Sequence, residues 1–411
     1  MPENKIYCQI IAAKPAVAWL DEFNPNIHPR LYQPFRPEAL KRPPHEIKST
    51  GGTAYILLEA STGSPQTVRN IGETCGAACR NCYLIRGGAR PDYTPSTQEA
   101  LEMRNSLEDK GFSVIFTGAE LLSLPQHFKA GLFNEKPYLL TSGLIVAQAP
   151  EKALELISTA GINNIQMSLH GASGSDNVFN GIPWQIVVKA VKNILAFNQK
   201  FGTYIGVVLN VTVGKHNLDQ LQNVADLVLA DESHGGLDCN GLRFNRHKAS
   251  GGRFQDLMLT EEDHATFYQI VGEIREKYPI STTGKTVNVS GDFGKLRRPS
   301  HNGKAPYECP AGIPGGEITI VPKKRGIHEV YSCLEVRDHR LQMGILQGGE
   351  LRLHTAPFER LKDTQLRSEF GLEHDADGCI AYVITRDNSS AEKILSYLTS
   401  SINLDNANLT I

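Results

Sequence analysis

Short apolar runs alternate with longer amphipathic segments from residue 53 to residue 245. The apolar runs predict strands at residues 53–60, 66–71, 112–116, 137–141, 164–169, 204–213 and 241–245. Apolar residues spaced three or four apart predict helices at residues 97–110, 150–160, 184–200, 218–230 and 260–278, and another within 121–133. This alternation is typical of parallel βα units. Counted from residue 66 there are six strands, and the local pattern fits either a barrel or a doubly wound open sheet.

The two ends of the chain have a different pattern. Residues 1–52 are rich in proline and poor in helical periodicity, which predicts an irregular arm packed on the main domain or, for its first residues, a loosely ordered tail. Residues 281–318 are rich in Gly, Pro, Lys and Arg, and short strands are predicted beyond them at 316–321, 330–333 and 350–353. We therefore expect an arm (1–52), an α/β domain (53–255) and a small α+β domain (256–411).

Composition and charge narrow the functional classes. Of the 411 residues, 40% are hydrophobic and 21% are charged, and the formal net charge is −2. This balance is typical of a globular protein and does not predict a nucleic-acid partner. The N-terminus lacks a signal-peptide core and no apolar run reaches membrane-spanning length, so we expect a cytoplasmic protein with no membrane partner. In that reducing compartment, eight cysteines predict metal or redox ligands rather than disulfides.

Three of the eight cysteines lie within eight residues, as Cys75, Cys79 and Cys82 in a Cys-x3-Cys-x2-Cys pattern. Thiolates at this density bind zinc or an iron–sulfur cluster. A structural zinc site needs a fourth protein ligand, whereas the next histidine is His127. Three thiolates therefore favour a [4Fe–4S] cluster with one iron open to a small molecule. A zinc loop and buried thiols are the alternatives.

This cysteine run resembles the signature of the radical S-adenosylmethionine (radical SAM) superfamily. The resemblance implies a partial (β/α)6 TIM-like barrel, with a [4Fe–4S] cluster on Cys75, Cys79 and Cys82 and SAM on its open iron. It also implies an external electron donor of the flavodoxin or ferredoxin type. SAM would be cleaved reductively to a 5′-deoxyadenosyl radical that abstracts hydrogen from the substrate. The family usually has an aromatic residue where Asn81 stands here, so adenine packing is expected to fall to Tyr83.

A second element follows the predicted strand at residues 112–116. Thr117-Gly118-Ala119-Glu120 resembles the family's Gly-Gly-Glu element, with Ala119 in place of the second glycine. The resemblance implies that the backbone at Gly118 and the carboxylate of Glu120 orient the SAM ammonium, since glycine permits close approach and a carboxylate pairs with an amine. The alternative is that Glu120 is a solvated residue at a helix N-terminus.

Polar residues on three later strands complete the predicted SAM contacts. Ser168 and His170 end the strand at 164–169, Asn210 lies within the next strand, and Arg243 lies on the last. The resemblance implies ribose contacts for Ser168, His170 and Asn210, and a SAM carboxylate contact for Arg243. The alternatives are a core hydroxyl, a structural histidine, a strand-end hydrogen bonder and a surface ion pair.

The C-terminal cysteines resemble part of a SPASM/Twitch extension. Glu308-Cys309-Pro310 precedes a predicted strand, and Cys333 and Cys379 follow it. The resemblance implies at most one auxiliary [4Fe–4S] cluster on Cys309, Cys333 and Cys379, because a complete SPASM module has more cysteines. Its fourth ligand would be Cys239, His374, Asp377 or the substrate. The alternative is an extension of buried thiols without a cluster. Cys8 is isolated and receives no role.

Three functions are open at this stage. The first is a radical SAM enzyme acting on a small polar metabolite, such as a sugar, aminocyclitol or nucleotide, by dehydrogenation, epimerisation or rearrangement. The second is a radical SAM maturase that modifies a peptide or protein side chain; the N-terminal arm does not resemble a leader-binding winged helix, which favours the small molecule. The third is a non-catalytic metal-binding scaffold. Cys239 is the candidate hydrogen donor to a substrate radical.

Overall fold

The computed structural model gives the placement of most of the predicted core. It describes residues 52–58, 89, 91–134, 136, 138–172, 181–248, 254–290, 293, 316–323, 326–335, 337 and 342–353, with the backbone of 409–410. Several predicted features lie outside the described residues: the arm, the strand at 66–71, Cys75, Cys79, Cys82, Tyr83, Cys309, His374, Asp377 and Cys379.

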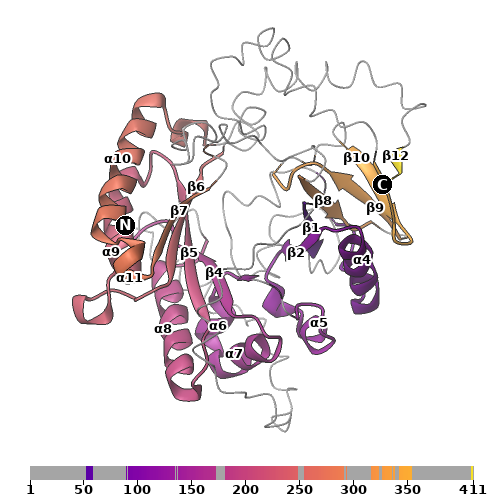
Figure 1. Cartoon of the computed structure of the whole chain (residues 1–411), viewed down its shortest axis with the longest axis horizontal. Helices are drawn as coiled ribbons and strands as arrows, with labels where there is room; N and C mark the ends of the chain where they lie inside the picture. Colours follow the sequence, from indigo (N-terminus) through magenta and orange to yellow (C-terminus); the bar gives the residue numbers. More distant parts are fainter. Residues whose placement is uncertain are drawn as a thin grey trace, which may run out of the picture.

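The first sheet consists of five parallel strands in the order β3-β4-β5-β6-β7 (Figure 1). These are β3 (Leu139–Leu140), β4 (Asn164–Ser168), β5 (Gly206–Val213), β6 (Gly241–Arg246) and β7 (Thr286–Val289). Three helices, α8 (Trp184–Phe201), α9 (Leu221–Leu229) and α10 (Glu261–Lys277), cover its outer face (Figure 1). Further helices are α6 (Leu144–Gln148), α7 (Pro150–Thr159) and α11 (Ile280–Thr283).

The two faces of this sheet differ in polarity. Along β5, the buried residues Val207, Leu209, Val211 and Val213 alternate with half-buried ones such as Asn210. The buried positions belong to the same core cluster as Val187, Ala190, Val191 and Ile194 of α8, which recur at helical spacing. Burying each such valine or isoleucine stabilises the fold by roughly 1.5–3 kcal/mol. The polar positions are left on the opposite, inner face of the sheet.

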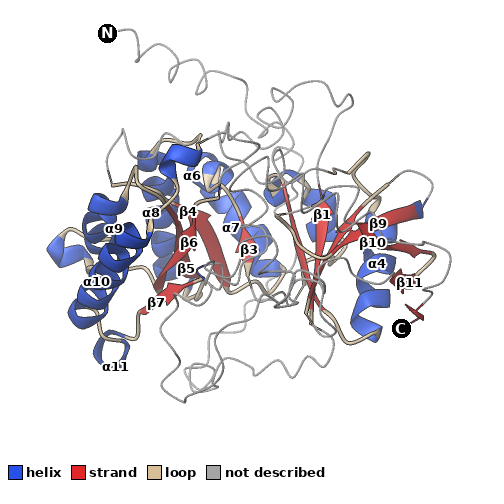
Figure 2. Cartoon of the chain, turned by 90° about the horizontal axis from the view of Figure 1, so that it is seen from above, coloured by secondary structure: helices blue, strands red, loops and turns tan. Residues whose placement is uncertain are grey.

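The second sheet has seven strands in the order β12-β11-β10-β9-β8-β1-β2. These are β1 (Thr53–Leu58), β2 (Ser113–Gly118), β8 (Glu317–Val321), β9 (Ile327–Tyr331), β10 (Gln342–Gln347), β11 (Glu350–Leu353) and β12 (Leu409–Thr410). β1 is parallel to both β2 and β8, and the remaining ladders are antiparallel. Helix α4 (Thr97–Asp109) lies on this side of the molecule (Figure 2), and α5 (Pro125–Lys129) follows β2 there (Figure 1).

The α/β class and the C-terminal strands were predicted correctly, but the strand count needs one correction. Within the described residues no ladder joins β2 to β3, so the ladders group the first six strands into two sheets. The strand beside β2 is β1, at the predicted run 53–60, so the count does not begin at residue 66. The division at residue 255 stays a prediction; β7 and β8, beyond it, are hydrogen-bonded to β6 and β1.

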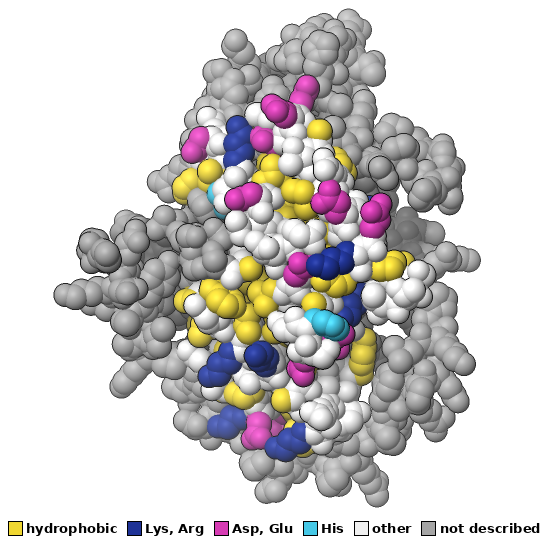
Figure 3. Space-filling view, turned by 90° about the vertical axis from the view of Figure 1, so that its left-hand side faces the viewer, with side chains coloured by type: hydrophobic (Ala, Val, Ile, Leu, Met, Phe, Trp, Pro, Cys, Tyr) yellow, Lys and Arg dark blue, Asp and Glu magenta, His cyan; other side chains and the backbone are white. Residues whose placement is uncertain are grey.

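The helix termini follow their local sequence. The hydroxyl of Ser96 accepts a hydrogen bond from the Glu99 amide at 3.2 Å and caps α4. Thr260 and Asp263 form a reciprocal capping box at the start of α10. Figure 3 shows the face on the side of α10, where acidic and basic side chains are interspersed with apolar ones. None of the described helices is both long and apolar enough to cross a bilayer.

Candidate functional site

The segment that carries Cys75, Cys79 and Cys82 is flanked on both sides by described residues that lie close together. It leaves after Leu58, the carboxyl end of β1, and the described chain resumes at Ala89. Leu57 and Ala89 are buried in the same small apolar cluster, together with Val321 at the carboxyl end of β8 and Tyr331 at the end of β9. In parallel α/β folds, ligands bind at the carboxyl edge of the strands. The cysteine segment is therefore attached at that edge.

Gly118 ends β2 against the same carboxyl end of β1. Its φ is +143°, and a Cβ placed on it would lie 2.1 Å from the carbonyl oxygen of Leu58. The next amide, of Ala119, donates a hydrogen bond to that oxygen at 3.3 Å. Only glycine fits this conformation and this approach. The strand contact alone requires glycine here, and the implied SAM contact of Gly118 stays a prediction.

Glu120 is buried, with 2% of its surface exposed, so the alternative of a solvated glutamate is wrong. Its carboxylate accepts hydrogen bonds from the Ser142 amide at 2.9 Å, the Ser142 hydroxyl at 2.5 Å and the Thr141 hydroxyl at 2.8 Å. It also caps a single 3-10 turn, η4 (Leu121–Ser123), by accepting from the Leu122 amide at 3.2 Å. Burial raises the pKa of Glu120, and these donors oppose the rise. The implied contact with the SAM ammonium stays a prediction.

Ser168, Asn210 and Arg243 lie side by side in one row across β4, β5 and β6. The register pairs Ser168 with Asn210, and Asn210 with Arg243. The side-chain nitrogen Nδ2 of Asn210 donates to Gln166 Oε1 at 3.4 Å. The side-chain oxygen Oδ1 of Asn210 is buried without a hydrogen-bond partner among the described residues. Sequence predicted each residue singly; the structure brings all three together on the inner face of the sheet.

His170 has a structural role in the described residues. Its Nδ1 accepts a hydrogen bond from the Thr212 amide of β5 at 3.0 Å, which assigns the ring proton to Nε2. Its carbonyl oxygen accepts from the side chain of Asn217 at 2.8 Å. Burial, with smaller contributions from His216 and His247, lowers the pKa of His170 to about 3. The imidazole is therefore neutral and ties the end of β4 to β5, as the structural alternative predicted, while the ribose contact stays a prediction.

Sequence reasoning missed two groups that face Arg243 from the other sheet. Glu317, at the start of β8, accepts a hydrogen bond from Tyr55 of β1 and interacts electrostatically with Arg243 and Lys248. Burial raises the pKa of Glu317 and of Tyr55. Glu317 pairs in register with Thr53, so it lies on the same face of the sheet as Tyr55. The available signal was Glu317 at the head of an apolar strand, but its partners are distant in sequence.

Cys239 lies at the amino edge of the five-stranded sheet, opposite to the edge at which β4, β5 and β6 end. It precedes β6, fully buried, and its amide donates to the carbonyl of Val228 at 2.9 Å. Burial raises the pKa of its thiol to about 12. β6 then carries the chain roughly 20 Å towards the carboxyl edge, at about 3.3 Å per residue. This placement does not favour Cys239 as hydrogen donor or auxiliary-cluster ligand, and both roles stay predictions.

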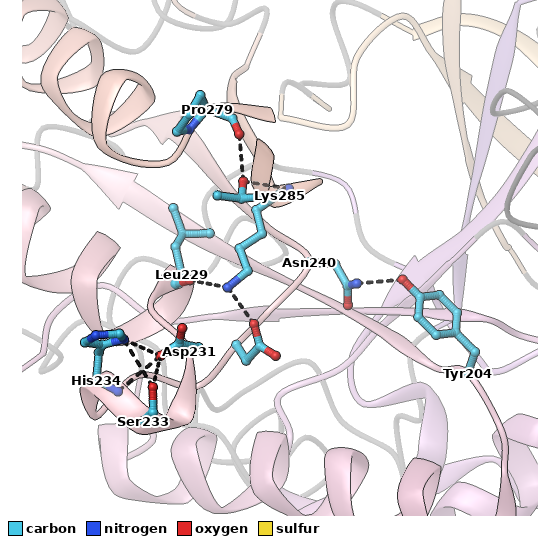
Figure 4. Close-up of polar contacts among 10 residues, drawn as sticks. Tyr204, Leu229, Asp231, Ser233, His234, Asn240, Pro279 and Lys285 are labelled. Carbon is cyan, nitrogen blue, oxygen red and sulfur yellow. Dashed lines mark hydrogen bonds and ion pairs between the residues drawn. The ribbon is translucent and has the colours of Figure 1, made fainter. Parts of the chain in front are cut away.

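Figure 4 shows the polar contacts of Lys285 and Asn240 near the start of β6. Lys285 pairs with Asp238 at 2.5 Å and donates to the carbonyl of Leu229. The Asn240 side chain accepts from the Val207 amide at 2.7 Å and donates to the Tyr204 hydroxyl at 2.6 Å. These bonds fix the turn that leads into β6. These contacts therefore have a structural role.

Cys333 is the described member of the predicted auxiliary set. It follows β9, is half-buried, and its sulfur accepts a hydrogen bond from the Glu335 amide at 3.4 Å. Within the described ranges, no group of three His, Cys, Asp or Glu side chains is arranged to hold a metal ion. The auxiliary cluster on Cys309, Cys333 and Cys379 therefore stays a prediction.

No family model matches the chain. The structure is similar to SuiB of Streptococcus suis bound to the precursor peptide SuiA, with a TM-score of 0.46 and 12% identity over 70% of this chain. It is also similar to native anSMEcpe with bound AdoMet and Cp18Cys peptide, with a TM-score of 0.47 and 14% identity over 84% of this chain and 96% of that one. Both are SPASM-domain radical SAM enzymes. The SuiB match spans 60% of the SuiB chain, and at these scores neither likeness decides the reaction or substrate of this protein.

Proposed function

We propose that this chain is a radical SAM enzyme whose site lies at the carboxyl edge of β1, β2, β4, β5 and β6. The observation that carries the proposal is the attachment of the cysteine segment. Its two described flanks, Leu57 and Ala89, are buried together at the edge to which β2 delivers Glu120. A three-cysteine cluster signature on a loop at a random position would have no such relation to the strand ends.

The chemistry of the described side chains fits SAM. SAM carries an ammonium, a carboxylate and ribose hydroxyls. Asn210 Oδ1 is a buried acceptor that needs a donor, which a ribose hydroxyl supplies. Arg243, in the same row, offers a fork of donors suited to a carboxylate. The Glu120 carboxylate already accepts hydrogen bonds from three residues, so an ammonium would share it with Ser142, Thr141 and Leu122.

The donor set of Cys75, Cys79 and Cys82 suits a [4Fe–4S] cluster, because soft thiolates are its usual ligands and three of them leave one iron for SAM. When bound, that cluster would supply the electron for reductive cleavage of SAM. The protein would hold SAM against the row Ser168, Asn210 and Arg243 and keep water out with the surrounding buried residues. Glu317 and Tyr55, facing Arg243 from the other sheet, are candidates for positioning the substrate.

Two substrate classes follow from the sequence, and the experiment is designed to separate them. The small polar metabolite was favoured from residues 1–52, which lie outside the described structure. The peptide or protein side chain was the alternative, and both similar structures named above contain a bound peptide. We propose that a peptide substrate is tested first, with sugar and nucleotide metabolites as the second set. The electron donor stays a flavodoxin- or ferredoxin-type protein, as predicted.

Anaerobic reconstitution with iron and sulfide tests the proposal. We expect four irons per chain for one cluster, or eight if an auxiliary cluster is present, and dithionite-dependent cleavage of SAM to 5′-deoxyadenosine. C75A, C79A and C82A should each remove the four irons of the SAM cluster and abolish SAM cleavage, whereas C333A should remove only the auxiliary iron. A wild-type protein that binds one tetrahedral zinc and leaves SAM intact would establish the metal-binding scaffold instead.

A further inference from the structure

We infer that Arg337 is a positioning residue that holds the returning end of the cysteine segment against the C-terminal sheet. The inference rests on the proposed function. Arg337 Nε donates a hydrogen bond to the carbonyl oxygen of Ala89 at 2.8 Å, and the Ala89 amide donates back to the carbonyl oxygen of Arg337 at 2.7 Å. The two residues are 248 positions apart, so this reciprocal pair joins distant parts of the chain.

The burial of Arg337 makes this contact selective for arginine. None of its surface is exposed, and it is the largest of the fully buried side chains in the described structure. A guanidinium stays charged at any physiological pH, so its burial requires fixed acceptors. Besides Ala89, the carbonyl oxygen of Leu334 accepts from its Nη1. The planar fork reaches two carbonyls in fixed directions, which the single ammonium of lysine cannot do.

Ala89 lies close in the sequence to the three cysteines, so its contact with Arg337 bears on their position. Ala89 follows Cys82 by seven positions (89 − 82), and seven residues span at most roughly 25 Å. The reciprocal hydrogen bonds between Arg337 and Ala89, called the clamp below, therefore limit how far the third cysteine can be from Ala89. Arg337 itself follows Cys333 by four positions (337 − 333). At the other end of the segment, the carbonyl of Leu58 is held by Ala119. Both ends are thus fixed by backbone hydrogen bonds.

The C-terminal sheet therefore sets where the cysteine segment returns. Leu57, Val321 and Tyr331 pack around Ala89, and Leu334 covers this cluster. Apolar packing alone permits sliding, whereas the paired hydrogen bonds with Arg337 fix Ala89 in one register. Loosening this register should leave three thiolates able to bind iron but should spread their positions. We expect weaker SAM binding and a broadened cluster environment instead of complete loss of iron.

The test compares R337K and R337M with R104M. Arg104 is a matched control because its guanidinium also donates to two backbone carbonyls, of Leu132 at 3.2 Å and Gly131 at 3.4 Å, but holds a different loop. Reconstituted R337K and R337M should retain iron, show at least a tenfold higher Kd for SAM, and give a reduced-cluster EPR signal that responds incompletely to SAM. R104M should match the wild type in its Kd for SAM and in its EPR signal. Wild-type SAM affinity in R337K and R337M would overturn the inference.

Hydrogen exchange keeps the test independent of the cluster. In wild-type apoprotein, peptides covering Ala89 should be protected, and R337K should speed their exchange at least tenfold. The Thr53 amide, which donates to Gly316 at 2.9 Å, should be unchanged. If the Ala89 amide of the wild type exchanges without protection, no clamp exists. If it is protected while the wild type fails to cleave SAM, the clamp stands and the proposed function fails.

Discussion

The carboxylate of Glu120 accepts a 2.9 Å hydrogen bond from the backbone amide of Ser142. Glu120 follows β2 and Ser142 follows β3, and these strands belong to different sheets. The bond, with that from the Ser142 hydroxyl at 2.5 Å, thus links the two sheets at their carboxyl ends. No backbone ladder joins β2 to β3 among the described residues, so the hydrogen bonds of this carboxylate hold the two sheets together there. The edge that would hold SAM therefore depends on Glu120.

Replacing Glu120 should therefore destabilise the fold as well as affect the site. E120Q keeps one acceptor oxygen but turns an amide towards the donors of Ser142 or Thr141, leaving a buried donor without an acceptor. We expect a loss of about 1–3 kcal/mol in the free energy of unfolding, measured by urea denaturation. The exposed Glu151, paired with Lys200 at 2.9 Å, provides the control E151Q, expected to stay within about 0.5 kcal/mol of the wild type. Equal stability of E120Q and E151Q would contradict the link.

Two glycine-to-alanine substitutions should change the stability of the fold in opposite directions. G118A places a Cβ against the Leu58 carbonyl in a backbone conformation that alanine avoids, so we expect a loss of several kcal/mol, about 3 or more, or no soluble protein. Gly272 lies within α10 with open space around the position of a Cβ. G272A should raise stability by about 0.5–1 kcal/mol because alanine is the better helix former. Thermal unfolding of both variants measures this, and a neutral G118A would refute the close approach.

Local sequence predicted the elements better than their partners. The caps Ser96 and Thr260 are visible in sequence because their hydrogen bonds span three residues. The four residues of β7 carry too little pattern to be recognised, and β10 was missed as well. The pairing of β8 with β1 joins segments more than 250 residues apart, and no local rule reports it.

The candidate site was predicted in the same uneven way. Ser168, Asn210 and Arg243 were singled out by the family resemblance, but their common row depends on strand register. The position of Cys239 at the amino edge was not predicted, because a residue next to a strand can lie at either edge of a sheet. Arg337 looked like an ordinary basic residue, since its partner is 248 positions away.

Cys239 should be dispensable for the chemistry. In the reconstituted enzyme, C239A should keep the wild-type iron content, SAM cleavage and product, because the thiol lies at the far edge of the sheet with a pKa near 12. Its only expected cost is a small cavity, with a loss of about 1 kcal/mol in stability. A variant that still cleaves SAM but no longer forms product would restore its role as hydrogen donor.

His170 should make stability depend on pH. With a folded-state pKa of about 3 and an unfolded value near 6.5, the unfolded chain binds the extra proton between these values. At neutral pH and above, the residue is unprotonated in both states and adds no pH dependence. As pH falls below about 6.5, stability should decline by up to about 1.4 kcal/mol per pH unit from this group. H170N keeps an acceptor for the Thr212 amide but cannot titrate, so urea melts from pH 7 to 5 should show a shallower decline. Parallel pH profiles would contradict the assignment.

Asn210 lies in β5 and Asn240 lies in the turn that leads into the neighbouring strand β6, and the two residues should separate ligand binding from stability. Asn210 Oδ1 has no partner among the described residues, whereas the Asn240 side chain is bonded to Val207 and Tyr204 at the opposite edge. N210A should therefore cost little stability but raise the Kd for SAM by about 3- to 10-fold, the equivalent of one lost hydrogen bond. N240A should lower the unfolding free energy by about 1–3 kcal/mol and leave SAM affinity unchanged.

Both effects are measured on the reconstituted protein, with SAM binding by equilibrium dialysis under anaerobic conditions and unfolding of the apoprotein in urea. The comparison is informative because each variant controls for the other: same residue type, same truncation, opposite edges of the sheet. If N240A weakens SAM binding as much as N210A does, the loss reflects general loosening of the sheet. In that case the row of Ser168, Asn210 and Arg243 would not be where SAM binds.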